Sequence, residues 1–171
     1  NSTPQQLLER MNKEYHRFWT PVRQGQCSSL GLSTVEVITL ASIVEEETNK
    51  DDEKAQIASV YLNRLRKGML LQADPTVKYA VGDFTLRRIL HKHLTVESPY
   101  NTYRCQGLPP GPICIPSIKS IDAVLANLQT DYLFFCAKED FSGYHNFAAT
   151  AQQHAKNAQR FHHAMNQHGI Q

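Results

Sequence analysis

The sequence lacks any apolar run near the roughly 20 residues that a membrane-spanning helix needs, and it has no recognisable signal peptide. It also lacks a basic block, since 18 lysines and arginines face 16 acidic residues for a net charge of +2. This balance gives no basis for nucleic-acid binding. The 171 residues are 41% hydrophobic and 20% charged, a composition typical of one globular domain with its own core.

Cysteine is scarce and its spacing is uninformative. The four cysteines, Cys27, Cys105, Cys114 and Cys136, form no CxxC pair, which argues against a structural zinc site. Four cysteines in this length do not impose a disulfide framework. Buried free thiols and disulfides therefore both stay open.

The eight histidines, like the cysteines, show no spacing typical of metal ligands. His91 and His93 lie two residues apart, so on a helix they face different directions, and no HExxH pair occurs. His145 and His154 meet only if the fold brings them together. The serine-nucleophile pattern GxSxG is also missing. We therefore expect no metal and no cofactor.

The apolar periodicity favours an α+β fold dominated by helices, with a small β-sheet and one proline-rich loop. Residues 20–31 and 98–117 are expected to be irregular because proline and glycine interrupt them. The predicted helices cover residues 4–20, 33–48, 51–68, 74–82, 85–94, 117–128 and 150–166. Residues 131–138 are predicted to form a buried strand, and residues 143–150 a second strand or a turn.

One of three consecutive glutamates falls on the apolar face of the second predicted helix. That face is formed by Val37, Leu40, Ile43 and Val44. Glu47 lies three residues after Val44 and so continues the apolar stripe, whereas Glu46 lies on the polar face and Glu45 at the edge. We expect Glu45 and Glu46 to be ordinary solvated carboxylates and Glu47 to point inward.

A carboxyl group on an apolar face loses hydration, which raises its pKa because the charged form is disfavoured. Such a glutamic acid can deliver a proton to a leaving oxygen near neutral pH. The alternative is that the helix ends at Glu47 and its side chain lies in water.

The segment "SPYNTYRCQGLPPGPI" predicts a stiff, aromatic surface loop suited to carbohydrate. Tyr100 and Tyr103 offer aromatic faces for stacking on sugars, and Asn101 and Thr102 can exchange hydrogen bonds with hydroxyl or N-acetyl groups. A rigid loop whose turns satisfy one another is the alternative.

Four segments in this order resemble the MltG (YceG-like) family of endolytic murein transglycosylases. They are "LASIVEEET", "ASVYLNRLRKGMLLQADPTVKYA", "SPYNTYRCQGLPPGPI" and "GYHNFAAT…H". The resemblance runs from Leu40 to His154. It implies a catalytic domain over residues 31–171, with residues 1–30 as a helical lead-in outside the match.

The resemblance implies cleavage of the β-1,4 bond between N-acetylmuramic acid and N-acetylglucosamine without water, which leaves 1,6-anhydromuramyl ends. Glu47 would serve as general acid and then as base, while the C6 hydroxyl of the sugar attacks intramolecularly. Two alternatives stay open. One is a hydrolase acting on the same bond, which needs a second carboxylate. The other is a non-catalytic peptidoglycan-binding module.

The resemblance also implies which residues bind substrate. They are Gln72, Asp74, Thr76, Tyr79, Tyr100, Asn101, Thr102, Tyr103, Pro109, Pro110, His145 and Phe147. Asp74 is also a candidate second carboxylate, although capping of a helix before Pro75 explains it at least equally well, and we expect this structural role. The sequence departs from the family at Cys114–Ser117, where a small residue followed by Asn-Pro-Gly is common, and at Ala148, where the family has serine.

Members of this family are tethered by an N-terminal membrane helix that this chain does not contain. The resemblance therefore implies a place outside the cytoplasmic membrane, on the periplasmic face of the inner membrane. The implied partners are peptidoglycan glycan strands and cell-wall synthases, with a role in strand termination. Cys105 and Cys114 would meet an oxidising space there and could pair or stay free.

Overall fold

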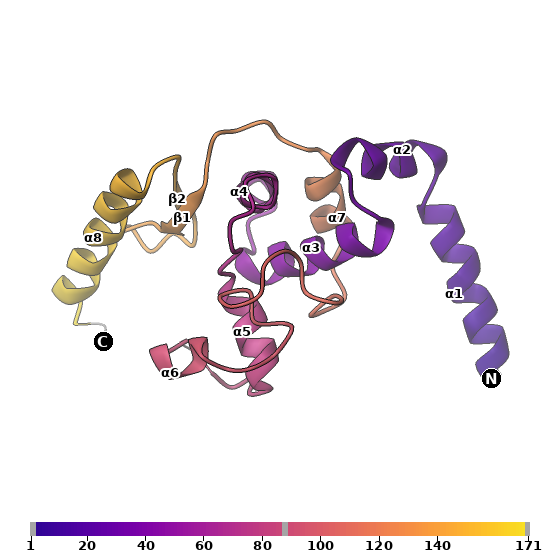
Figure 1. Ribbon diagram of the computed structural model, residues 1–171, viewed down its shortest axis with the longest axis horizontal. Helices are drawn as coiled ribbons and strands as arrows, with labels where there is room; N and C mark the ends of the chain where they lie inside the picture. Colours follow the sequence, from indigo (N-terminus) through magenta and orange to yellow (C-terminus); the bar gives the residue numbers. More distant parts are fainter. Residues whose placement is uncertain (1–2, 87–88, 170–171) are drawn as a thin grey trace.

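The computed structural model describes residues 3–86 and 89–169. In this part of the chain, helices dominate and a two-stranded sheet is added (Figure 1), which confirms the predicted α+β class. The elements are α1 (Pro4–Phe18), α2 (Pro21–Leu30), α3 (Thr34–Glu47), α4 (Lys54–Arg66), α5 (Asp74–Val81), α6 (His91–Leu94), α7 (Ile118–Leu125), β1 (Phe134–Ala137), β2 (His145–Ala148) and α8 (Ala151–Gln167).

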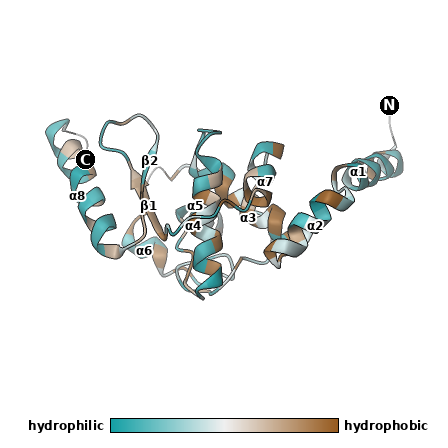
Figure 2. Ribbon diagram, turned by 90° about the horizontal axis from the view of Figure 1, so that it is seen from above, coloured by the Kyte–Doolittle hydropathy of each residue, from teal (hydrophilic) through white to brown (hydrophobic). Residues whose placement is uncertain are grey.

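Helix α3 is the centre of the core. It begins with a capping box, in which Ser33 Oγ accepts from the Glu36 amide at 3.2 Å and Glu36 Oε2 accepts from the Ser33 amide at 2.8 Å. Helices α4 and α7 pack against it, and the side chains of Val37, Leu40, Ile43 and Val44 are completely buried. Figure 2 shows apolar residues gathered on α3, α7 and the strands, whereas α8 is mainly hydrophilic.

A β-hairpin links the central helices to α8. Strands β1 and β2 are antiparallel, with Phe134 opposite Ala148 and Phe135 opposite Phe147. Strand β1 also contacts α4, and α8 packs on both strands. The hairpin therefore lies between α4 and the C-terminal helix, as Figure 1 shows.

Residues 21–30 form helix α2, so the prediction of an irregular segment there is wrong. Thr20 caps the helix by accepting from the Arg23 amide at 3.3 Å, and Pro21 occupies the first turn, where its missing N–H costs nothing. Gly31, with φ of 69°, ends the helix in the left-handed conformation. The proline starts a helix here rather than breaking one.

The N-terminal segment joins the core only through its second half. Helix α1 has no buried residue, whereas Trp19 and Cys27 belong to the core cluster. Helix α2 contacts α3 and α7. The division of the chain at residue 30 into lead-in and catalytic domain stays a prediction.

Three further expectations have clear outcomes. Residues 98–117 form turns without a regular element, as predicted. Of the helix predicted over residues 85–94, only His91–Leu94 is helical, and residues 87–88 lie outside the described part. All four cysteines are free thiols.

No helix in the described ranges is by itself long and apolar enough to cross a bilayer. Helices α2 and α3 reach that length and hydropathy only as a pair, and a bend of 78° separates them.

The burial of α3 predicts a large cost for truncating its core residues. Leu40→Ala should lower the free energy of unfolding by about 2–5 kcal/mol, because it leaves a cavity among packed helices. Val35→Ala on the same helix is the control, because Val35 is exposed and should change stability by less than about 0.5 kcal/mol. Equal effects in urea denaturation would contradict the placement of α3 at the centre of the core.

Candidate functional site

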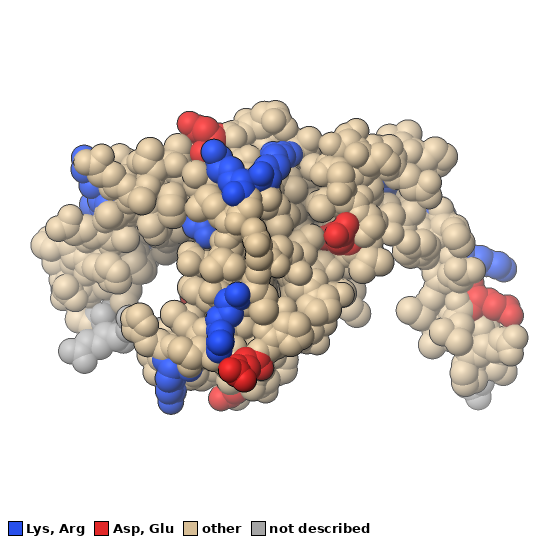
Figure 3. All heavy atoms as spheres, viewed as in Figure 1, with Lys and Arg blue, Asp and Glu red and all other residues tan. Residues whose placement is uncertain are grey.

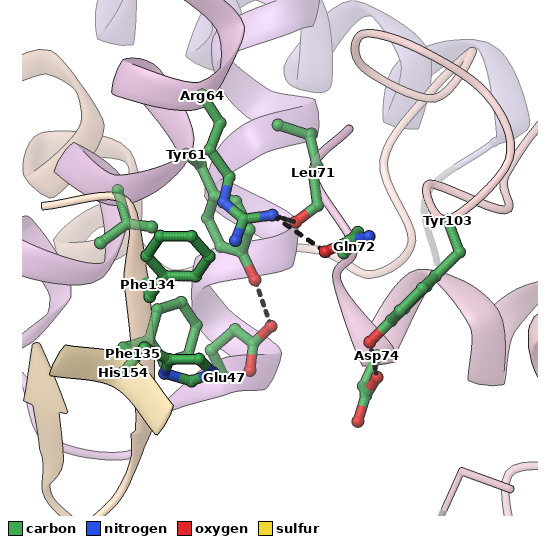
Figure 4. A pocket seen from close by; sticks show the side chains of 11 residues that line it. Glu47, Tyr61, Arg64, Leu71, Gln72, Asp74, Tyr103, Phe134, Phe135 and His154 are labelled. Carbon is green, nitrogen blue, oxygen red and sulfur yellow. Dashed lines mark hydrogen bonds between the residues drawn. The ribbon is translucent and has the colours of Figure 1, made fainter. Parts of the chain in front are cut away.

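The last turn of α3 places Glu47 in a cavity of about 340 Å³. Helix α4, the loop before α5, the proline-rich loop, β1 and α8 supply the other walls (Figure 4). The lining residues are Glu47, Val60, Tyr61, Arg64, Leu71, Gln72, Asp74, Tyr103, Phe134, Phe135 and His154. In the space-filling view the molecule is hollowed between the arm that carries α8 and the central body (Figure 3).

Glu47 points into this cavity although α3 ends there. Burial raises the pKa of the Glu47 carboxyl to about 7. The Tyr61 hydroxyl, which donates to Oε1, opposes the shift, whereas the negative charges of Asp74 and Glu46 add to it. A substantial fraction of Glu47 therefore carries a proton at neutral pH, as general acid catalysis requires. The expectation of an inward carboxyl holds.

Glu45 is not the ordinary solvated carboxylate that its position predicted. Burial alone would raise its pKa, but hydrogen bonds from Ser120 and Ser117 outweigh burial and, with Lys54, lower the pKa to about 2. The Ser117 hydroxyl lies 2.7 Å and the Lys54 ammonium 3.2 Å from Oε2. Glu45 therefore ties α3 to the start of α7 and to α4, and it stays ionised.

Arg64, which the sequence did not single out, holds the cavity wall together. It is only 7% exposed. Its Nε donates to the carbonyl of Leu133 at 2.7 Å, and its Nη1 donates to the carbonyls of Leu70 at 2.9 Å and Leu71 at 3.2 Å. Burial lowers the pKa of this guanidinium, which nevertheless stays charged at neutral pH. Helix α4 is thereby fixed to the residue before β1 and to the loop before α5.

Gln72 lies in the cavity, as predicted, on a strained backbone. Its φ is +52°, a left-handed conformation that non-glycine residues seldom adopt. The backbone amide of Gln72 donates to the Thr102 carbonyl at 3.1 Å, and the Gln72 side-chain oxygen accepts from Arg64 at 3.4 Å. These contacts hold the strained residue so that its side chain faces the cavity.

Asp74 and Tyr103 form a second polar pair in the cavity. The Tyr103 hydroxyl donates to Asp74 Oδ1 at 2.6 Å, and burial together with this carboxylate raises the pKa of Tyr103. The N-cap of α5 is Ala73, so Asp74 makes no cap hydrogen bond. The alternative of a capping aspartate is therefore not realised.

Three residues predicted to bind substrate are enclosed in the protein: Thr76, Asn101 and Thr102. Asn101 donates to the carbonyls of Leu94 at 2.9 Å and Val96 at 2.8 Å, which shapes the proline-rich loop. Thr102 Oγ1 lies 2.8 Å from Thr76 Oγ1. The prediction of direct substrate contact is inconsistent with this arrangement. The polar atoms of these side chains form hydrogen bonds within the loops that support Gln72 and Tyr103.

Other predicted residues lie beside the cavity rather than in it. Tyr79 and Tyr100 pack against each other with ring centroids 4.7 Å apart, and Tyr79 lines a separate hollow that includes Glu46. Phe147 stacks on Tyr132 at 5.4 Å. Pro109 is buried and Pro110 is exposed, and neither lines the Glu47 cavity.

His145 belongs to a neighbouring hollow that Glu47 also lines. Its ring Nδ1 lies 2.7 Å from Glu53 Oε2, and its backbone amide donates to Glu53 Oε1 at 2.7 Å. His154 lines the main cavity instead, so the two histidines do not converge. No three histidine, cysteine, aspartate or glutamate side chains in residues 3–86 and 89–169 are placed to hold a metal ion.

Comparisons with known proteins relate the chain to one family. The model of the YceG-like family matches residues 1–160. An endolytic murein transglycosylase of Bacillus subtilis strain 168 is 43% identical over 130 residues, which cover 76% of this chain and 35% of that protein. An endolytic murein transglycosylase of Streptococcus pneumoniae strain D39 is 32% identical over 136 residues, covering 77% of this chain and 24% of that protein.

A solved structure agrees in fold. The crystal structure of a YceG-like protein from Listeria monocytogenes superposes with a TM-score of 0.72 at 40% identity. The similarity covers 78% of this chain and 43% of that one. The chain thus spans about a third or less of the curated relatives it matches.

The raised pKa of Glu47 predicts a pH-dependent cost of folding. Below pH about 4 the carboxyl is protonated in both the folded and the unfolded chain, so it costs nothing. Between the ordinary value of 4.5 and about 7 only the unfolded chain releases the proton, so stability falls as pH rises. Glu47→Gln should therefore add up to roughly 3 kcal/mol of unfolding free energy near pH 8 and almost none near pH 4.

Urea denaturation at both pH values measures this difference. Glu9→Gln is the matched control, because it removes an exposed carboxyl outside the cavity and should keep the pH trend of the unmutated chain. A Glu47→Gln gain that is the same at both pH values would argue against a buried, protonated carboxyl.

Proposed function

This chain belongs to the YceG-like family, and on that premise we propose that it cleaves the β-1,4 bond between N-acetylmuramic acid and N-acetylglucosamine in peptidoglycan. The reaction consumes no water and leaves a 1,6-anhydromuramyl end. The relatives that share this region are named endolytic murein transglycosylases. The carrying observation is a single, partly buried glutamate that lines a cavity and whose pKa of about 7 suits it to both giving and taking a proton.

Glu47 acts first as the general acid. Because the Tyr61 hydroxyl donates to Oε1, the proton belongs on Oε2, which has no hydrogen-bond partner among the described residues. This proton passes to the glycosidic oxygen as the bond to the anomeric carbon breaks. The glycan that departs thereby gains a free hydroxyl.

The resulting carboxylate then acts as the base. It removes the proton of the C6 hydroxyl of the muramyl sugar while that oxygen attacks the anomeric carbon of the same ring. The new bond closes the anhydro ring, and Glu47 regains the proton that it gave. Because nucleophile and electrophile belong to one sugar, holding the ring in place replaces a bimolecular step.

Asp74 distinguishes this mechanism from hydrolysis of the same bond. It is the other carboxylate that lines the Glu47 cavity in the described part of the chain. A hydrolase needs a second carboxylate to hold water or to act as nucleophile. Asp74 Oδ1 is occupied by the Tyr103 hydroxyl, and its charge raises the pKa of Glu47, which supports a role in keeping the acid protonated.

The setting of the reaction follows from the family resemblance. We propose that the full-length protein is anchored in the cytoplasmic membrane and works on its outer, periplasmic face. Glycan strands are the substrate, and cell-wall synthases are the proposed partners. Cleavage inside a strand would end its growth at the membrane.

Digestion of purified sacculi by this chain tests the activity. Mass spectrometry of the released muropeptides should find anhydromuramyl ends, and Glu47→Gln should lower turnover by at least about a thousandfold, because it removes the dedicated acid and base. Glu9→Gln, an exposed change outside the cavity, should keep full activity.

Each other product pattern contradicts a part of the proposal. Reducing ends would indicate a hydrolase, and no products would indicate a binding module. An active Glu47→Gln combined with a folded but inactive Glu46→Gln would show that the acid is assigned to the wrong glutamate.

The hydrogen bond from Tyr61 predicts a shift in the pH profile. It lowers the pKa of Glu47, so Tyr61→Phe should raise that pKa and move the alkaline limb of kcat/KM to higher pH. Turnover at the optimum should fall roughly ten- to a hundredfold because the carboxyl loses its fixed orientation.

Tyr15→Phe serves as the control for losing a phenolic hydroxyl, since Tyr15 lies on α1 outside the cavity. Its pH profile should match that of the unmutated chain. An unshifted alkaline limb in Tyr61→Phe would mean that another group limits the reaction there.

A further inference from the structure

His154 contributes an imidazole ring to the Glu47 cavity that the mechanism above does not use. It lies in the first turns of α8, and its ring stacks on Phe134 with centroids 5.1 Å apart and planes at 19°. Figure 4 shows it among the side chains that surround the cavity. The stacking restricts the ring, so its two nitrogens have fixed surroundings.

The two ring nitrogens differ in access. Nδ1 is the only fully enclosed side-chain nitrogen or oxygen in the described residues that has no hydrogen-bond partner. Nε2 also has no partner among these residues, and because it is not enclosed it is open to a ligand in the cavity. Enclosed polar atoms without a partner are rare in native proteins, so this ring requires an explanation.

The surroundings fix the protonation of the ring. Burial, followed by the positive charge of Arg64, lowers the pKa of His154, so the imidazole is neutral at neutral pH. A neutral imidazole carries one N–H. On Nδ1 that hydrogen would be an enclosed donor without an acceptor, whereas on Nε2 it can be donated to a ligand. The ring therefore presents Nε2–H to the cavity.

Most other hydrogen-bond donors of the cavity are already engaged. The Tyr61 hydroxyl donates to Glu47, the Tyr103 hydroxyl donates to Asp74, and Nε and Nη1 of Arg64 donate to backbone carbonyls. Asn101, which the sequence offered for N-acetyl groups, is enclosed within its own loop. Apart from the Gln72 side-chain amide and Arg64 Nη2, which has no hydrogen-bond partner among the described residues, His154 is the remaining side-chain donor.

The apolar part of the wall indicates which acceptor fits. It is formed by Val60, Leu71, Phe134 and Phe135. An N-acetyl group combines a methyl group, which suits such a wall, with a carbonyl oxygen, which needs a donor. Both sugars of the proposed substrate carry this group.

We propose that His154 determines specificity by donating a hydrogen bond from Nε2 to the carbonyl oxygen of an N-acetyl group, on a sugar next to the bond that Glu47 cleaves. This inference rests on the proposed function, from which the substrate is taken. It concerns recognition of the glycan and adds no step to the proton transfers.

Binding measurements in the Glu47→Gln background test the proposal without turnover. The probes are isolated glycan strands, either fully N-acetylated or enzymatically de-N-acetylated, with Kd measured by calorimetry. His154→Phe keeps an aromatic ring on Phe134 but has no donor, and it should weaken binding of the N-acetylated strands roughly tenfold or more. On the de-N-acetylated strands the same change should have almost no effect.

Two amide variants separate the ring nitrogens. Glutamine places an N–H near the position of Nε2, whereas asparagine places one near Nδ1. His154→Gln should therefore keep affinity within about threefold, and His154→Asn should behave like His154→Phe. His162→Phe, an exposed change on the same helix, is the control and should leave Kd unchanged.

Equal weakening of both glycans by His154→Phe would overturn the proposal, as would full rescue by asparagine or no measurable binding of either strand. Thermal unfolding of each variant shows whether α8 is still folded. If His154→Phe is unfolded, its weakened binding does not count, and the affinity of His154→Gln decides the proposal instead. Failure of the proposed function would appear separately, as missing anhydromuramyl products from the chain with Glu47 intact.

Discussion

The burial of the Glu47 carboxyl at the end of a core helix is the constraint on which the site depends. Helix α3 is packed between α4 and α7, and its last turn directs the Glu47 side chain into the cavity. Desolvation disfavours the carboxylate, and one neutral donor, Tyr61, compensates only in part. The balance leaves the pKa at about 7, where one group can act as acid and then as base. The proposed mechanism, which uses a single dedicated carboxyl, needs this intermediate value.

Glu45 and Glu47 show how partners, rather than burial alone, decide what a carboxyl does. Both lie in the last turn of α3 and both are partly buried. Glu45 accepts hydrogen bonds from two serine hydroxyls and an ammonium group, which hold its pKa at about 2. Glu47 accepts from one neutral hydroxyl and feels two negative charges, so its pKa rises to about 7. Environments that separate two carboxyl pKa values divide a structural role from a chemical one.

The sequence was sufficient where a local period or a cap decides the structure. The 3.6-residue period predicted the inward direction of Glu47, and Ser33 with Glu36 predicted the start of α3. It failed where partners come from distant segments. Ser117 and Ser120, whose hydrogen bonds lower the pKa of Glu45, lie more than seventy residues after Glu45 in the chain.

Turn geometry was a second source of error. The direction of Asn101 depends on turns whose conformation composition does not determine, so a polar side chain expected to face substrate is enclosed instead. Pro21 was expected to break a helix, although it begins one. A proline that starts a helix is distinguished from one that interrupts it by the residue before it, and here that residue is the N-cap Thr20. The family resemblance identified segments correctly, but it could not separate side chains that line the cavity from those that support it.

Helix α4 connects the acid to the walls of the cavity. Tyr61 and Arg64 are three residues apart and so lie on one face of this helix. Tyr61 orients Glu47, while Arg64 binds the carbonyls before α5 and before β1. Helix α4 thus fixes the relative positions of Glu47, of Gln72 and of the aromatic wall. The proposed chemistry, in which a sugar attacks itself, needs this fixed relation, because small displacements between acid and substrate cost large factors in rate.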